Sequence, residues 1–143
     1  MYKQNDSLAL VGRILIGVLF LSSGLGKLAA PAATQAYIAA VGLPAPVIAY
    51  ALSLTVEVIG GLLLIAGLRV RLVGAGLALF TLATAVFFHH NFADQNQMIH
   101  FFKNFAIIGG LLQVVSFGAG KFSVDSWLVR RASFSGVAPQ AVK

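Results

Sequence analysis

Four long apolar runs, separated by short polar or basic stretches, organise this chain. They cover about residues 8–28, 47–68, 70–92 and 99–117. A membrane-crossing helix needs roughly 20 predominantly apolar residues, so each run is long enough, or nearly so, to span a bilayer. The apolar positions are continuous rather than alternating, which disfavours membrane strands. The pattern therefore predicts an all-α fold, a polytopic membrane four-helix bundle.

The connections between these runs predict two further helical segments and one tight turn. Residues 32–41 have helical character and precede the helix breakers Gly42 and Pro44, so we expect a short interfacial helix at the outer surface. Only a few residues around Arg69 join the second and third runs, which makes those helices antiparallel neighbours. Residues 123–131 predict a C-terminal amphipathic segment on the anionic inner leaflet.

Composition supports a membrane protein and excludes several classes of function. Of the 143 residues, 59% are hydrophobic and 10% charged, whereas soluble domains carry about 25% charged residues. The chain has no cysteine, which excludes disulfides, thiolate-bound metals and thiol catalysis by this chain. The net charge of +6 would suit nucleic acid in a soluble protein, but in a membrane protein it marks cytoplasmic loops. We therefore expect the lipid bilayer, and no nucleic acid, as a partner.

The distribution of cations predicts the topology. With a cytoplasmic N-terminus, most of the basic residues fall on the inner side, namely Lys3, Arg13, Arg69, Arg71, Lys121, Arg130, Arg131 and Lys143. Only Lys27 and Lys103 fall on the outer side. The positive-inside rule then favours a multi-pass protein with both termini in the cytoplasm. A cleaved signal peptide is the less favoured alternative, because the first run is long for one and contains Arg13. We predict a membrane domain over residues 1–120 and a basic cytoplasmic tail over residues 121–143.

Two charged side chains, Arg13 and Glu57, lie inside the predicted spans and away from their ends. A charge at the centre of a bilayer costs about 2.5–3.5 kcal/mol and normally faces a partner or water. At 1.5 Å per residue, Glu57 lies roughly 15 Å deep and Arg13 roughly 7–8 Å deep, so their side chains can bridge the difference. We expect Arg13 and Glu57 to form a buried ion pair. A proton relay through these residues, or a protonated Glu57, is the alternative.

Nitrogen-bearing side chains gather at the predicted outer ends of the spans. They are Lys27, His89, His90, His100, Lys103 and Asn104. Because few acids lie near them, they suit an anionic or carbonyl-bearing ligand, such as a lipid headgroup, a quinone oxygen or a small oxyanion. The alternative is simple snorkelling of polar side chains to the interface. We expect no metal site, since adjacent histidines on a helix point about 100° apart and no carboxylate or cysteine completes a set.

Several short motifs, in this order, resemble the bacterial DoxX family. They are Gly12-Arg13, Gly17, Phe20, Ser23-Gly24, Gly26-Lys27-Leu28, Gly42-Leu43-Pro44, Glu57, Gly60-Gly61, Leu64, Gly67-Leu68-Arg69, Thr84-Ala85, Phe88-His89-His90, Phe102-Lys103-Asn104 and Gly109-Gly110. The resemblance covers about residues 8–125 and rests on order and spacing, since no single motif is specific. It implies a small four-helix protein of the bacterial inner membrane. It also places Arg13, Lys27, Glu57, His89, His90 and Lys103 on the family's polar motif positions.

The resemblance also implies a functional context. The family takes its name from relatives linked to terminal quinol oxidase and thiosulfate:quinone oxidoreductase, although most members have no assigned reaction. The absence of cysteine argues against autonomous thiosulfate chemistry. We therefore expect a redox-associated subunit that binds a quinone or similar ligand near the outer leaflet and carries no covalently bound cofactor. Lys27, Lys103 and His89 or His90 would donate to the ligand, and Asn104 would orient it.

These residues are compatible with an accessory subunit of a quinone-linked oxidoreductase and with two other functions. Electron transfer would require a cofactor-bearing soluble or membrane oxidoreductase as partner. One alternative is a non-enzymatic scaffold whose basic cytoplasmic segment, residues 121–131, recruits a soluble oxidoreductase. Another is a small transporter or channel that uses Glu57, which would require a homo-oligomer or a very small cavity.

Overall fold

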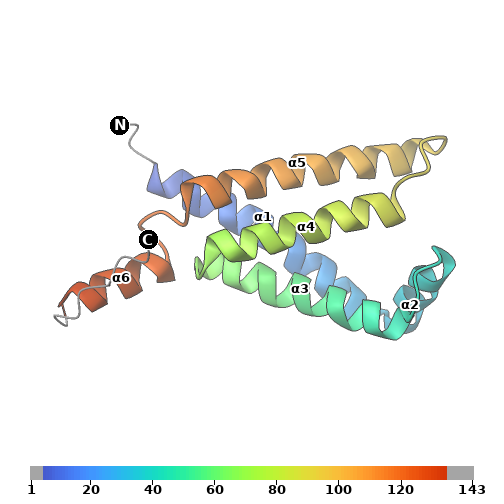
Figure 1. Cartoon of the computed structure of the whole chain (residues 1–143), viewed down its shortest axis with the longest axis horizontal. Coiled ribbons are helices and arrows are strands. Elements are labelled where there is room, and N and C mark those ends of the chain that lie inside the picture. The colour runs from blue at the N-terminus through green and yellow to red at the C-terminus, as the bar shows by residue number, and fades with distance from the viewer. Residues whose placement is uncertain (1–4, 135–143) are drawn as a thin grey trace.

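The protein is built from long helices that run between its two ends and cross one another obliquely (Figure 1). The computed structural model describes residues 5–134, and in this part the elements are α1 (Asp6–Ala29), α2 (Pro31–Ala40), α3 (Pro46–Ala66), α4 (Val70–Phe88), α5 (Gln95–Phe117) and α6 (Val124–Phe134). Four of these helices, α1, α3, α4 and α5, are long and apolar enough to cross a membrane. The predicted all-α polytopic membrane fold is therefore confirmed.

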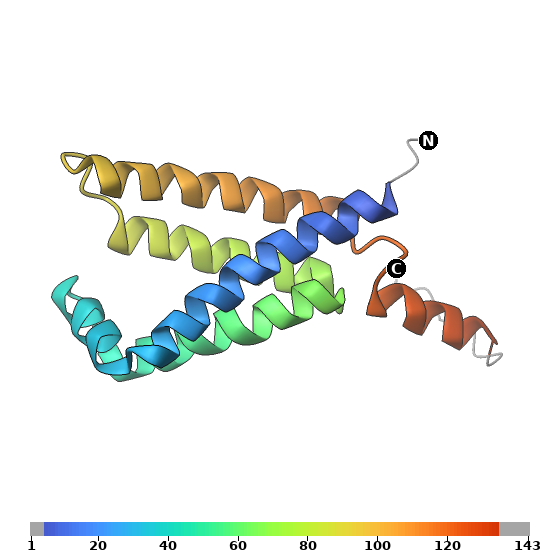
Figure 2. The same cartoon turned by 180° about the vertical axis from the view of Figure 1, so that it is seen from behind.

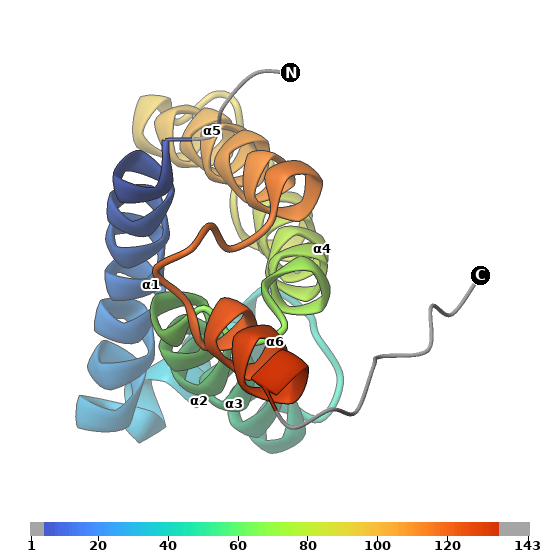
Figure 3. The same cartoon turned by 90° about the vertical axis from the view of Figure 1, so that its left-hand side faces the viewer.

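The four long helices form one bundle with two distinct ends. Helix α1 packs against α3, α4 packs against α5, and α3 adjoins α4; Figure 3 shows the four helices around a common axis. A buried apolar cluster holds them together, formed by Phe20, Leu64, Leu77, Ala78 and Leu111. Helix α2 and the α4–α5 connection lie at one end, the α2 end (Figure 1). The start of α1, the α3–α4 turn and α6 lie at the other, the α6 end (Figure 2).

Two glycines let α1 and α3 approach each other closely. A Cβ atom added to Gly17 would lie 2.9 Å from the carbonyl oxygen of Gly61, and one added to Gly61 would lie 2.9 Å from the carbonyl oxygen of Gly17. These distances are shorter than normal van der Waals contact, so the two helix backbones touch at this crossing. Small residues at helix interfaces are the usual means of close packing in membranes.

Replacing Gly17 with alanine is expected to lower the free energy of unfolding by about 1–3 kcal/mol, because the methyl group would force α1 and α3 apart. Denaturant titration in detergent measures the change. Gly26→Ala is the matched control on the same helix, since an added Cβ there meets nothing within 4 Å. The control should be neutral or slightly stabilising through helix propensity. Equal losses in the two variants would contradict the proposed close contact.

Most predicted boundaries agree with the structure, but the connection between α4 and α5 is placed differently. Helix α4 ends at Phe88 rather than near residue 92, and α5 begins at Gln95 rather than near residue 99. The Asp94 carboxylate caps α5 by accepting hydrogen bonds from the amides of Asn96 (2.8 Å) and Gln97 (3.4 Å). Because the first turn of α5 is polar, its sequence is typical of a loop as much as of a helix. The predicted short helix after the first span is confirmed as α2.

Helix α6 is attached to the bundle at the α3–α4 turn. The Asp125 carboxylate accepts hydrogen bonds from the amides of Arg69 (2.8 Å) and Val70 (3.3 Å), and the Asp125 amide donates to Gly67 O (3.0 Å). The first amides of a helix have no acceptor within that helix. The Asp125 carboxylate, which is distant in sequence, accepts their hydrogen bonds at the start of α4. The predicted amphipathic segment is thus a docked helix. The part of the predicted tail beyond residue 134 lies outside the described residues.

Candidate functional site

A cavity of about 560 Å³ lies towards the α2 end of the bundle. Side chains of α1, α2, α3, α4 and α5 contribute to its wall, and most of them are apolar. The polar members are Ser23, Lys27, Thr34, Tyr37, Ser53, Glu57, Thr81, Thr84, His89 and Asn104. The cavity therefore combines an apolar interior with a limited set of hydrogen-bonding groups, which is typical of small-molecule sites.

The divergence of α3 and α4 creates this cavity. The two helices are in contact where Gly60 faces Leu77, and they separate towards the α2 end (Figure 1). Helix α2 covers that end, with Ile38 buried and the ring of Tyr37 5.4 Å from the ring of Phe88 at the end of α4. The cavity is thus closed by α2 at the membrane surface and bounded by the long helices within the bilayer.

A partly buried ion pair forms part of the cavity wall. The Lys27 ammonium donates to both carboxylate oxygens of Glu57, at 2.7 and 2.6 Å, and to Ser23 Oγ at 2.9 Å. The Ser23 hydroxyl in turn donates to Glu57 Oε1 at 3.1 Å. Glu57 is only 4% exposed. Lys27 and Ser23, which are partly exposed, therefore neutralise and hydrogen-bond the buried Glu57 carboxylate, as a charge at membrane depth requires.

The expected ion pair between Arg13 and Glu57 is wrong. Arg13 instead donates from Nη1 to the carbonyl oxygens of Leu64 (2.9 Å) and Ile65 (3.0 Å), and from Nη2 to that of Phe122 (2.7 Å). Helical side chains incline towards the N-terminus of their own helix. Helix α1 begins at the α6 end and α3 begins at the α2 end (Figure 2). Arg13 therefore extends away from Glu57, whereas Lys27 and Glu57 extend towards each other.

Only some residues of the predicted outer cluster line the cavity. Lys27, His89 and Asn104 line the cavity together with Glu57, whereas His90 and Lys103 are exposed and do not line it. His100 also lies outside the wall and stacks on His89, with ring centroids 5.0 Å apart. His89 Nδ1 is 2.9 Å from Gln97 Oε1, so α5 orients this ring at the end of α4.

Several polar residues of the wall were not among the predicted site residues, although Ser23 and Thr84 lie in the motifs that carry the resemblance. The main ones are Ser23, Ser53, Thr81 and Thr84. The hydroxyls of Ser53, Thr81 and Thr84 donate to carbonyls of their own helices, at 2.7–2.8 Å, which leaves their oxygens as acceptors. The sequence spacing could have identified two of them. Ser23 precedes Lys27 by four residues and Ser53 precedes Glu57 by four, so each serine shares a helix face with a charged residue.

Comparison with known proteins agrees with this architecture. The DoxX family profile matches residues 8–90. Inner membrane protein YqjF of Escherichia coli (strain K12) is 38% identical over 131 residues, which cover 92% of this chain and 99% of the relative. Inner membrane protein YphA of the same organism is 32% identical over 123 residues, covering 82% of this chain and 88% of the relative. No solved structure matches the chain significantly. With four apolar spans and these relatives, the chain belongs to the DoxX family and is a multi-pass protein of the inner membrane.

Proposed function

We propose that the cavity at the α2 end binds a neutral, carbonyl-bearing molecule from the lipid phase, of which a quinone is the representative. The observation that carries this proposal is a mostly apolar cavity of about 560 Å³ whose wall contains a closed Lys27–Glu57 ion pair. That volume lies within the range of roughly 300–1,000 Å³ usual for small-molecule sites. It accommodates a ring and the first part of an apolar tail.

The ion pair favours a neutral ligand over an anion. Lys27 is the cation that an oxyanion would need, but Glu57 already neutralises it at 2.6 Å. An anion in the cavity would have to displace Glu57 and leave that carboxylate buried without its partner, which is strongly unfavourable. A quinone carbonyl needs only a neutral hydrogen-bond donor. The side-chain amide of Asn104 is the candidate donor in the wall. The neutral ring of His89 donates from Nδ1 to Gln97 Oε1, so its Nε2 atom is an acceptor.

The apolar boundary of the cavity supports arrival of the ligand from the bilayer. Leu52 of α3 and Phe87 of α4 line the cavity and are also 61% and 48% exposed on the membrane-facing surface. They lie on the two helices that diverge towards the α2 end (Figure 1). By the positive-inside rule we assign the α6 end to the cytoplasm, so the cavity occupies the outer-leaflet half. In this proposal the chain is a ligand-binding subunit, and a cofactor-bearing oxidoreductase partner performs any electron transfer.

Titration of the purified protein in detergent with a short-tailed ubiquinone is expected to show saturable binding by calorimetry. Asn104→Leu should weaken the affinity about fivefold, the value expected for the loss of one neutral hydrogen bond. Lys103→Leu is the matched control, because Lys103 adjoins Asn104 in sequence and lies outside the cavity wall. Absence of saturable binding, or equal losses in the two variants, would contradict the proposal. Tight binding of thiosulfate in the same titration would contradict the neutrality of the ligand.

A further inference from the structure

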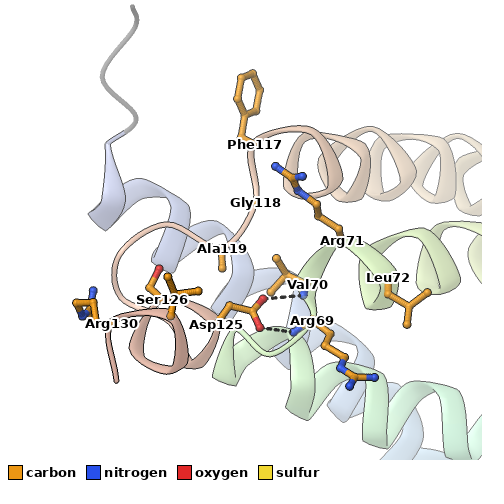
Figure 4. A pocket seen from close by; sticks show the side chains of 11 residues that line it. Arg69, Val70, Arg71, Leu72, Phe117, Gly118, Ala119, Asp125, Ser126 and Arg130 are labelled. Atoms are coloured by element: carbon orange, nitrogen blue, oxygen red, sulfur yellow. Dashed lines mark hydrogen bonds between the residues drawn. The ribbon is translucent and has the colours of Figure 1, made fainter. Parts of the chain in front are cut away.

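A second depression, of about 660 Å³, lies at the opposite end of the molecule, between α4, α5 and α6. In Figure 4, Asp125 lies between Arg69 on one side and Arg130 on the other, and Arg71 extends towards Phe117. Arg69 and Arg71 come from the start of α4, and Arg130 comes from α6. Arg71 also reaches the chain as it leaves α5, since a Cβ added to Gly118 would lie 3.8 Å from its Nε and Nη2 atoms.

The charges around this depression are not balanced by the part of the chain that the structure describes. Asp125 is its single acidic lining residue, and both of its carboxylate oxygens accept hydrogen bonds from backbone amides at the start of α4 (dashed in Figure 4). Within the described residues 5–134, Arg69, Arg71 and Arg130 form no side-chain ion pair or hydrogen bond. The depression therefore carries three guanidinium groups against one carboxylate that already stabilises a helix terminus.

Apolar side chains adjoin these cations at the level where the spans end. Leu72, Phe117 and Val129 line the same depression and are 70%, 65% and 61% exposed. Helix α4 enters its membrane span at Val70 and α5 leaves its span at Phe117. The depression thus presents cationic groups and exposed apolar groups side by side at the membrane surface, which is the pattern that an anionic amphiphile complements.

We propose that this depression binds the phosphate group of an anionic phospholipid, with the acyl chains against Leu72 and Phe117. Guanidinium groups are suited to phosphate because their paired N–H donors match two phosphate oxygens. Basic residues at an anionic membrane surface gain about fivefold in affinity each, corresponding to about 1 kcal/mol per residue. The bound lipid bridges α6 to the ends of α4 and α5 and adds to the contact made by Asp125. This site is independent of the cavity at the α2 end.

The chain contains one tryptophan, Trp127, which lies on α6 three residues before Arg130 and is 49% exposed. Its fluorescence therefore reports which lipids gather near the depression. The full-length protein is reconstituted in vesicles that contain equal fractions of either brominated phosphatidylglycerol or brominated phosphatidylcholine, and quenching is compared. We expect stronger quenching by the anionic lipid. The preference should fall about fivefold in each of Arg69→Gln, Arg71→Gln and Arg130→Gln.

Lys121→Gln is the matched control, because Lys121 is a cation at the same end that lies outside the depression and pairs with Asp6 at 3.4 Å. It should leave the lipid preference unchanged. Equal quenching of the wild type by both lipids would overturn the proposal, and so would an equal loss of preference in Lys121→Gln, which would indicate diffuse surface charge. Displacement of the brominated anionic lipid by millimolar inorganic phosphate would show recognition of phosphate alone and would also overturn it. Quenching by phosphatidylcholine is the reference for correct insertion of every variant.

Discussion

Replacing Arg13 with methionine is expected to lower the free energy of unfolding by about 3 kcal/mol. The side chain is 1% exposed and donates three hydrogen bonds, two of them to the carbonyls of Leu64 and Ile65 near the end of α3. Those carbonyls lie in the last turn of α3; Leu64 O also accepts from the Gly67 amide at 3.2 Å, whereas Arg13 is the donor to Ile65 O. The third bond holds Phe122 in the segment before α6. Hydrogen bonds to charged groups contribute about 1.5–3 kcal/mol each, and unpaired buried carbonyls add a further cost. Denaturant titration in detergent, followed by circular dichroism, measures the loss.

Lys103→Met is the control for the Arg13 variant, since Lys103 is an exposed cation that lies outside both the cavity and the depression. Surface substitutions change stability by about 0.5 kcal/mol or less. Arg13→Lys should be intermediate, because lysine keeps the charge but lacks the forked donors that reach α3 and the segment before α6 at once. An unfolding free energy for Arg13→Met that equals that of the control would show that the three carbonyl contacts do not stabilise the fold.

Replacing Lys27 with methionine is expected to cost about 3 kcal/mol, because the substitution leaves the Glu57 carboxylate buried without its cation. Glu57 keeps only the weaker contact from Ser23 Oγ, at 3.1 Å. The double variant Lys27→Met/Glu57→Gln should recover most of the loss, since it removes both charges together. A double-mutant cycle on the free energy of unfolding should therefore give a large coupling between these positions.

A second double-mutant cycle, on Arg13 and Glu57, distinguishes the observed Lys27–Glu57 ion pair from an Arg13–Glu57 ion pair. Coupling between Arg13→Met and Glu57→Gln is expected to be small, with the two losses adding within about 0.5 kcal/mol, because the residues share no partner. Additive losses for Lys27 and Glu57, or strong coupling between Arg13 and Glu57, would contradict the observed ion pair. Each outcome tests the arrangement of charges without requiring any knowledge of the ligand.

Much of the fold follows from the pattern of residues along the chain. The four spans, the short α2 helix and the amphipathic α6 helix are all predicted from apolar runs and breakers such as Gly42 and Pro44, and the structure places them close to those positions. The start of α5 is the exception. Its first turn is polar and depends on the Asp94 cap, so apolar periodicity alone places it several residues late.

The candidate site could be predicted only in part. Lys27, Glu57, His89 and Asn104 are unusual residues for a membrane span or its end, and that rarity identifies them. The hydroxyl residues Ser53 and Thr81 are common in membrane helices, so composition does not single them out. Whether a polar residue such as Lys103 lines the cavity or faces outwards depends on the rotation of its helix within the bundle.

The sequence by itself determined the membrane class, the number of spans and the family, because a hydrocarbon environment accepts only long apolar helices and these leave a plain pattern along the chain. Only the tertiary structure decided which charges pair and where a ligand can bind. Depth along a helix can be counted from residue numbers, but side-chain direction reverses between antiparallel helices. The cavity depends on the angle at which α3 and α4 separate. The Lys27–Glu57 pair and the cavity beside it are therefore properties of the packed bundle, set by helix direction and crossing geometry rather than by position in the chain.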